Sequence, residues 1–295
     1  MTPSTVEALR AAGLDPAAVE EIVRRALAED LGPQRLDVTS VATIPADRTD
    51  VADLVARASG VVAGLPVAAA VFDAASEGTL RFEARAHDGA RVARGDVLAT
   101  VAGPTRAMLS AERTALNLLC RMSGVATHTR AWADAVAGTG TAVLDTRKTT
   151  PGLRVLDKYA VRAGGGTNKR MGLYDVAMVK DNHTLAAGGV TAALERVRAA
   201  FPDVPVQVEV DTVAEAVAAV EAGATFLLCD NMPPAVLREV VAAVAGRAEL
   251  EATGGLTLDR AGEYARTGVD FLSVGALTHS SPILDIALDL RPKGW

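Results

Sequence analysis

The sequence predicts an α/β protein in two parts, an α+β region over residues 1 to about 117 and a region of alternating strands and helices after it. Three observations support this prediction. The first region mixes helical spacing with strand-like alternation, whereas the second alternates short apolar strands with amphipathic helices. The last four expected strands begin at residues 206, 225, 249 and 270, which gives intervals of 19, 24 and 21 residues. This spacing is typical of a parallel sheet, either closed as a barrel or open and doubly wound.

The first region begins with helical spacing and continues with strands. Over residues 5–29 apolar side chains recur between charged ones, namely Leu9, Ile22, Val23 and Leu27. Residues from about 50 to 105 are predicted to be rich in β-structure. Asp88-Gly89 and residues 94–96 (RGD) are turn signals between alternating segments.

Six short apolar strands are expected in the second region, at residues 141–145, 176–180, 206–210, 225–230, 249–253 and 270–275. Helices are expected between the later ones, at residues 191–201, 212–223, 235–246 and 258–268. Several of these end in glycine, a common C-terminal stop. Thr212 and Glu215 have the spacing of a capping box at the start of the second helix.

Polar residues follow each expected strand, at Arg147-Lys148, Lys180-Asp181, Glu209 and Asp211, Asp230-Asn231, Thr253-Gly254-Gly255 and Gly275. In a β/α-barrel the carboxyl ends of the strands meet on one rim, which carries the catalytic loops. The sequence therefore predicts a single site formed by these residues.

Lysine is scarce and clustered. The chain has 25 arginines and five lysines, and Lys148, Lys158, Lys169 and Lys180 lie within 33 residues. This window contains Arg154, Arg162, Arg170 and a run of three glycines, and Arg147 directly precedes it, which makes the segment a candidate site for a polyanion. Arginine binds carboxylates as a bidentate fork, and lysine binds phosphate oxygens as a point charge. Lys158 taken alone is also consistent with a solvated charge.

Two further groups complete the candidate site. The glycines in residues 251–256 (EATGGL) and 273–280 (SVGALTHS) allow backbone N–H groups to approach phosphate oxygens. Glu209 and Asp230 end two neighbouring strands, where carboxylates could bind a divalent metal or ribose hydroxyls, or stabilise a developing cation. Salt bridges to the nearby lysines are the structural alternative for these two carboxylates.

The composition limits the protein class. A net charge of −6 gives no electrostatic footprint for nucleic acid, and the longest apolar run, residues 58–72, is shorter than the roughly 20 residues of a membrane helix. The N-terminal segment lacks the pattern of a signal peptide, so we expect a cytoplasmic protein. Cys120 and Cys229 are expected to be reduced core residues, and the four histidines have no zinc-binding spacing.

Several segments resemble the quinolinate phosphoribosyltransferase family, also called carboxylating nicotinate-nucleotide pyrophosphorylases. The longest is residues 145–183, DTRKTTPGLRVLDKYAVRAGGGTNKRMGLYDVAMVKDNH. Others, in order along the chain, are ALAEDLG, DVTS, AERTALNLLCRMSGVAT, VEVDT, LLCDN, EATGGL and VGALTHS. Together they cover nearly the whole chain.

The resemblance implies a fold and an activity. The fold is an N-terminal α/β sandwich (residues 1–117), a β/α-barrel of about seven strands (118–280) and a C-terminal tail (281–295) that packs back on the first domain. The reaction combines quinolinate with phosphoribosyl pyrophosphate, requires Mg²⁺, and yields nicotinate mononucleotide, pyrophosphate and CO2 for NAD biosynthesis. The implied assembly is a homodimer, or a hexamer built as a trimer of dimers, with active sites at subunit interfaces.

The resemblance also assigns roles to residues. Quinolinate carboxylates would meet Arg147, Arg170 and Lys180, together with Arg113 from the neighbouring subunit. Lys148 and Thr149 would bind substrate, with Lys148 on a phosphate of the donor, and Glu209 and Asp230 would lie near the ribose and the metal. Lys148, Glu209 and Asp230 are the expected catalytic residues. The phosphate end would be formed by Thr253, Gly254, Gly255, Gly275 and His279.

The chain departs from the family pattern at Lys169, where the family commonly has histidine. Lysine keeps the positive charge and loses the imidazole, so a carboxylate-binding role remains, whereas an acid/base role is put in doubt. Two other functions are compatible with the residues. One is an aldolase-like barrel with a Schiff base on Lys180 or Lys148, and the other is a non-catalytic metabolite-binding or molybdenum-transport-associated protein.

Overall fold

The computed structural model describes residues 1–292 and divides the chain into two compact units. The N-terminal unit comprises residues 1–128, 150–165 and 280–292, and the barrel unit comprises residues 129–149 and 166–279. The boundary expected at residue 117 lies inside the long helix α5 (Thr105–Ala135). Residues 150–165 fall in the predicted barrel range but belong to the N-terminal unit, where Asp157 accepts hydrogen bonds from Arg121.

Two helices, not one, occupy the N-terminal segment with helical spacing. Helix α1 (Pro3–Ala11) and helix α2 (Pro16–Leu31) are separated by a turn in which Gly13 has a φ of +69°. Pro16 begins α2 and lacks an N–H, while the Asp15 side chain caps it by accepting from Ala17 N at 3.1 Å. The chain therefore turns at residues 12–15.

An antiparallel sheet of four strands forms the centre of the N-terminal unit, in the order β12-β1-β5-β3. The strands are β1 (Thr49–Ala56), β3 (Arg81–Ala84), β5 (Val97–Pro104) and β12 (Ile286–Leu290). The C-terminal strand β12 returns to pair with β1, and residues 293–295 of the predicted tail lie outside the described residues. A second antiparallel pair joins β2 (Gly60–Val61) to β4 (Arg91–Val92). The unit also contains α3 (Val38–Thr43) and α6 (Arg154–Ala163).

Helix α4 (Leu65–Ser76) lies within the region expected to be β-rich, and it is the main departure from the predicted elements. Its sequence is almost continuously apolar, and nine of its residues are buried, so it carries no amphipathic period. Periodicity cannot distinguish a short buried helix from a buried strand. The helix begins at Leu65, where Asp88 accepts hydrogen bonds from Gly64 N and Leu65 N at 2.7 and 3.1 Å.

The barrel unit is built on six parallel strands in the order β6-β11-β10-β9-β8-β7. They are β6 (Ala142–Leu144), β7 (Ala177–Val179), β8 (Val206–Val210), β9 (Phe226–Asp230), β10 (Glu249–Thr253) and β11 (Phe271–Ser273). Thr167 forms an isolated parallel β-bridge with Leu144 of β6, so one further segment pairs with the sheet without forming a full strand. The predicted α/β class with a barrel of about seven strands is confirmed, with six full strands.

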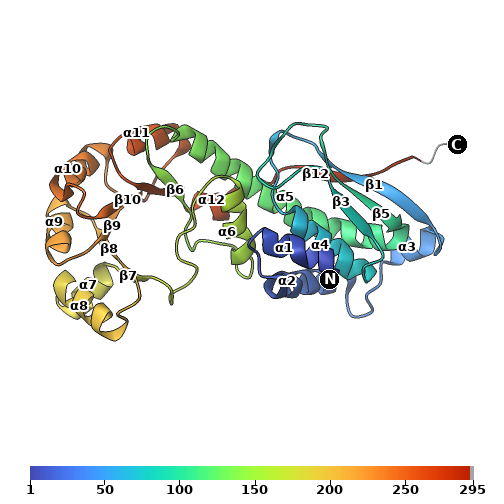
Figure 1. Ribbon diagram of the computed structural model, residues 1–295, viewed down its shortest axis with the longest axis horizontal. Helices are drawn as coiled ribbons and strands as arrows, with labels where there is room; N and C mark the ends of the chain where they lie inside the picture. Colours follow the sequence, from blue (N-terminus) through green and yellow to red (C-terminus); the bar gives the residue numbers. More distant parts are fainter. Residues whose placement is uncertain (293–295) are drawn as a thin grey trace. The chain divides into compact units, whose positions relative to one another are not determined.

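Helices lie outside this ring of strands, as Figure 1 shows for α7 to α11. They are α7 (Asp181–Ala187), α8 (Val190–Ala200), α9 (Val213–Glu221), α10 (Pro234–Val244), the 3₁₀ turn η1 (Leu258–Arg260), α11 (Ala261–Ala265) and α12 (Ala276–His279). All six expected strands are confirmed to within two residues at each end, and Thr212 and Glu215 form the expected capping box of α9. Within residues 1–292, no helix is long and apolar enough to cross a membrane.

Candidate active site

A cavity of about 590 Å³ opens at the carboxyl ends of the barrel strands, on the rim where the sequence predicts the site. Most of the predicted site residues line it, namely Arg147, Lys148, Lys169, Arg170, Lys180, Glu209, Asp230, Thr253, Gly254 and Gly255. Thr146, Met178, Leu228 and Asn231 complete the lining. The parallel sheet brings these residues together because all its strands end on the same side.

Arg147 and Arg170 are the two guanidinium groups of this cavity. Burial lowers the pKa of Arg170, and the nearby positive charge of Arg147 lowers it further. Arg170 donates to Val176 O at 2.9 Å, which orients its side chain. Within the described part of the chain, neither arginine forms an ion pair with a carboxylate. The charge of Asp175 opposes these two effects by raising the pKa of Arg170. Two adjacent half-buried cations that form no salt bridge are suited to an anion with more than one negative group.

Lys169 forms an ion pair with Glu251 at the floor of the cavity. Its Nζ lies 2.6 Å from Glu251 Oε1, and the two side chains are 7% and 0% exposed. Asp145, fully buried at the end of β6, holds this loop by accepting from Lys169 N at 2.8 Å and from Asn168 Nδ2 at 2.6 Å. The motif containing Glu251 was recognised in the sequence, but its side chain was not assigned a role.

Lys180 and Glu209 form a second ion pair, at the ends of the neighbouring strands β7 and β8. Glu209 is largely buried, whereas Lys180 is about half exposed. On the next strand, Asp230 accepts from Asn231 Nδ2 at 2.9 Å. The structural alternative considered for Glu209, a salt bridge to a nearby lysine, is therefore present alongside its place in the cavity.

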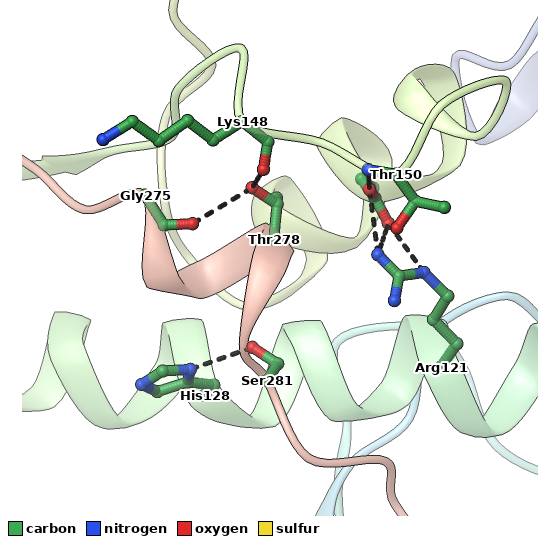
Figure 2. A network of polar contacts seen from close by, with 8 residues as sticks. Arg121, His128, Lys148, Thr150, Gly275, Thr278 and Ser281 are labelled. Atoms are coloured by element: carbon green, nitrogen blue, oxygen red, sulfur yellow. Dashed lines mark hydrogen bonds and ion pairs between the residues drawn. The ribbon is translucent and has the colours of Figure 1, made fainter.

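The backbone of Lys148 is held by the turn that follows β11 (Figure 2). Thr278 Oγ1 donates to Lys148 O at 2.9 Å and lies 3.3 Å from Gly275 O. Gly275 lies directly under the Lys148 side chain, because a Cβ at this glycine would be 3.0 Å from Lys148 Cδ and 3.3 Å from His279 Nε2. The side chain of Lys148 remains exposed, so its ammonium is available to a ligand.

Thr150, two residues after Lys148, begins the segment 150–165 of the N-terminal unit. There Thr150 N donates to Asp157 Oδ2 at 3.0 Å. The Arg121 guanidinium donates to both carboxylate oxygens, from Nε to Oδ1 at 3.1 Å and from Nη2 to Oδ2 at 3.0 Å (Figure 2). Asp157 is 1% exposed, and these donors help to compensate its buried charge. His128 Nδ1 contacts Ser281 Oγ at 2.8 Å in the same unit.

The glycine turn after β10 is required by its surroundings. Gly254 has a φ of +87°, and a Cβ there would lie 2.3 Å from Asn231 Oδ1. Asn231 itself has a φ of +52° and donates its N–H to Thr253 O at 2.9 Å. These contacts leave the backbone of Gly254 and Gly255 on the cavity wall, where sequence analysis expects phosphate oxygens.

Other predicted residues lie elsewhere. Thr149 is half-buried and is not part of the cavity lining, while His279 lies at the end of α12 beside Gly275. Arg113 is exposed on the part of α5 that belongs to the N-terminal unit. Lys158, which could have been a solvated charge, is 1% exposed within the N-terminal unit. Cys120 and Cys229 are buried thiols, as predicted.

The candidate metal ligands are two carboxylates at the strand ends, Glu209 and Asp230. Among residues 1–292, no group of three or more His, Cys, Asp or Glu side chains is placed to hold a metal ion. Glu209 and Asp230 both face the cavity from adjacent strands. Three signals in the sequence could have identified the unassigned residues Asp145, Asn231 and Glu251. Asp145 is an acid directly after a strand, Asn231 follows a strand and contacts the glycine turn at Gly254, and Glu251 is a charged residue at a strand position that faces inward.

Comparison with known proteins gives matches over almost the whole chain. The family model for the quinolinate phosphoribosyl transferase N-terminal domain matches residues 37–123, and that for the C-terminal domain matches residues 125–289. A nicotinate-nucleotide pyrophosphorylase [carboxylating] of Mycobacterium leprae is 50% identical over 277 residues, covering 92% of this chain and 97% of the relative. A quinolinate phosphoribosyltransferase [decarboxylating] of Nicotiana tabacum is 41% identical, covering 91% and 81%. The crystal structure of NadC from Streptococcus pyogenes superposes with a TM-score of 0.90 at 35% identity, covering 95% and 99%.

Proposed function

Since the chain belongs to the quinolinate phosphoribosyltransferase family, we propose roles for its cavity residues in the reaction of that family. The enzyme transfers the phosphoribosyl group of phosphoribosyl pyrophosphate to quinolinate, and decarboxylation gives nicotinate mononucleotide in NAD biosynthesis. A Schiff-base aldolase and a non-catalytic metabolite-binding protein are the two functions that this assignment replaces.

The acceptor binds at Arg147 and Arg170. Quinolinate carries two carboxylates, and among the described residues neither guanidinium group forms a salt bridge, although the Asp175 charge acts on Arg170 and raises its pKa. Lys180 and Lys169 lie beside them, each already paired with a glutamate. This arrangement is the observation that supports the proposal, because each charge-assisted hydrogen bond to a carboxylate contributes about 1.5–3 kcal/mol.

The donor binds along Lys148 and the glycine turns. The exposed ammonium of Lys148 contacts a phosphate group, and the backbone N–H groups of Gly254 and Gly255 contact others. Thr253, Gly275 and His279 complete the phosphate end. The turn after β11 places the Lys148 stem over Gly275, so a side chain at Gly275 would compete for the same space.

The carboxylates of Glu209 and Asp230 stabilise the positive charge that develops at the anomeric carbon as pyrophosphate leaves. They also fit a magnesium ion, which prefers oxygen ligands and is usually held by one or two carboxylates together with substrate phosphates. When bound, Mg²⁺ neutralises charge on the pyrophosphate group. Glu209 keeps Lys180 as a partner, and this ion pair orients its carboxylate at the cavity.

Decarboxylation needs positioning more than a protein nucleophile. Once the ring nitrogen is ribosylated it is cationic, so it stabilises the electron pair that the departing CO2 leaves on the adjacent ring carbon, and this carbon then takes a proton from water. The arginines hold the remaining carboxylate and so maintain the orientation of the ring. The proposal also includes a homodimer or trimer of dimers, to which Arg113 contributes across the interface, and a cytoplasmic location, which is consistent with the thiols Cys120 and Cys229.

The test is product formation from two acceptors. The purified enzyme is incubated with phosphoribosyl pyrophosphate, Mg²⁺ and either quinolinate or nicotinate, and nicotinate mononucleotide is quantified by chromatography. Nicotinate has one carboxylate fewer and leaves a desolvated cation unpaired, so its kcat/KM is expected to be at least about 100-fold lower. Comparable efficiencies for the two acceptors would contradict the proposed acceptor site.

A further inference from the structure

Glu251 lies in the middle of β10 and faces the barrel interior beneath the substrate cavity. In the register of the sheet it is level with Leu228 of β9, which is level with Glu209 of β8. Residues in register share a face of a parallel sheet, and both Leu228 and Glu209 line the cavity. Glu251 is 0% exposed, so substrate reaches the side chains above it and not its own carboxylate.

The carboxylate of Glu251 has one cationic partner. Its Oε1 accepts from Lys169 Nζ at 2.6 Å, and within residues 1–292 its Oε2 has no hydrogen-bond partner. A buried carboxylate requires a nearby positive charge, so Lys169 compensates it. Lys169 differs from Glu251 in lining the cavity, and its ammonium can donate more than one hydrogen bond.

Lys169 is hydrogen-bonded both at its backbone N–H and at its side-chain ammonium. Asp145 accepts from Lys169 N at 2.8 Å, so the residue is restrained at its main chain by β6 and at its ammonium by β10. Such restraint is unnecessary for a solvated loop cation. It is what a ligand contact requires, because a pre-oriented donor loses little conformational entropy when substrate binds.

We propose that Glu251 is a positioning residue of the acceptor site, whose buried carboxylate holds the Lys169 ammonium in the cavity, charged and directed at a quinolinate carboxylate. The inference rests on the acceptor site proposed above. Glu251 does not touch the substrate in this arrangement, and it acts through Lys169.

The charges around Lys169 determine the effect of removing Glu251. Burial lowers the pKa of Lys169, the charges of Arg170 and Lys180 lower it further, and Glu251 opposes all three by raising it. Asp145 faces the Lys169 main chain from the end of β6. Burial, and to a smaller extent the nearby charge of Glu251, raise the pKa of the Cys229 thiol on β9 to about 12. Without the Glu251 charge, Lys169 therefore loses its proton at a lower pH than in the native enzyme.

The test is Glu251→Gln, which keeps the size of the side chain and removes its charge. We expect the KM for quinolinate to rise at least ten-fold at pH 8.5, the KM for phosphoribosyl pyrophosphate to stay within two-fold, and kcat to fall less than three-fold. The alkaline limb of the kcat/KM profile for quinolinate should move to lower pH. Calorimetric titration of the enzyme with quinolinate alone should show the same ten-fold weakening, with added proton uptake on binding at alkaline pH.

Two further variants separate charge from packing. Glu249→Gln removes an exposed carboxylate from the same strand and should leave all these quantities within two-fold of wild type. Lys169→Arg/Glu251→Gln carries a cation that does not titrate, so the alkaline limb should return to its wild-type position. Retention of wild-type quinolinate affinity and pH profile by folded Glu251→Gln overturns the inference. Absence of nicotinate mononucleotide formation by the wild type would instead contradict the proposed function, so the two failures are distinguishable.

Discussion

Single residues in this site are constrained by close neighbours that are distant in sequence, and Gly275 is an example. A Cβ added at this position would lie 3.0 Å from Lys148 Cδ and 3.3 Å from His279 Nε2. Gly275→Ala should displace the flexible Lys148 side chain and raise the KM for phosphoribosyl pyrophosphate about three- to ten-fold, a loss of roughly 1 kcal/mol of binding. The free energy of unfolding should change by less than about 1 kcal/mol, because a lysine stem can move. Initial rates over a range of donor concentrations measure the first quantity, and urea titration measures the second. An unchanged donor KM would show that Lys148 does not need this space.

Lys169 gives a second prediction at the same scale, and it concerns stability. Lys169→Met leaves the buried Glu251 carboxylate without a cation, and breaking a buried pair at one partner costs about 3–5 kcal/mol. Lys169→Met/Glu251→Gln removes both charges and should recover more than half of that loss. Urea unfolding followed by circular dichroism measures both variants. A single variant as stable as the wild type would mean that water or another cation reaches Glu251.

At the scale of elements, helix α9 begins with a complete capping box, whereas α8, α10 and α11 begin without a side-chain cap hydrogen bond. Thr212 Oγ1 accepts from Glu215 N at 3.2 Å, while Glu215 Oε2 accepts from Thr212 N and Asp211 N at 3.1 and 2.8 Å. Thr212→Ala should lower the free energy of unfolding by about 1 kcal/mol, because one backbone donor of α9 loses its acceptor. Thr257→Ala is the matched control, since Thr257 occupies an N-cap position without a side-chain hydrogen bond. Equal losses in the two variants would show that the α9 capping box adds no stability.

At the scale of the whole molecule, the prediction concerns a shared active site. Arg113 is exposed on α5, while the apolar residues beside it, Ala115, Leu116, Leu118 and Leu119, are buried. In a two-fold dimer each subunit would donate one Arg113 to its partner and receive one in return. Arg113→Ala and Lys148→Ala should each inactivate the pure enzyme. Each hybrid dimer, however, has one site with both its own Lys148 and an intact partner arginine.

Mixing the two variants after reversible dissociation tests this arrangement. Random pairing makes half of the dimers hybrid, and each hybrid has one functional site in two, so about a quarter of wild-type activity should return. Hybrid formation is verified by native mass spectrometry of differently tagged subunits. Hybrids that form without any recovery of activity would show that Arg113 does not act across the interface.

The amino-acid sequence by itself determined those parts of the molecule that depend on local patterns. Hydrophobic periodicity and capping residues, which span only a few positions, predict the six barrel strands, the helices after them and the capping box at Thr212. The polar strand ends also predicted most of the cavity lining, because parallel strands place their carboxyl ends on one rim. The same patterns could not identify α4, whose nearly continuous apolar sequence carries no helical period.

Only the tertiary structure decided which charges are paired. Lys169 and Glu251 are 82 residues apart in sequence, and nothing in either local segment specifies that their side chains meet inside the barrel. Sheet order likewise places β6 beside β11, and burial of Lys158 depends on packing between distant elements. Contacts of this kind arise from long-range packing, which a single sequence encodes only through the completed fold. The sequence therefore identified a group of cations near one another. The structure distinguishes Lys169 and Lys180, which are paired with glutamates, from Arg147 and Arg170, which form no salt bridge with any residue in 1–292.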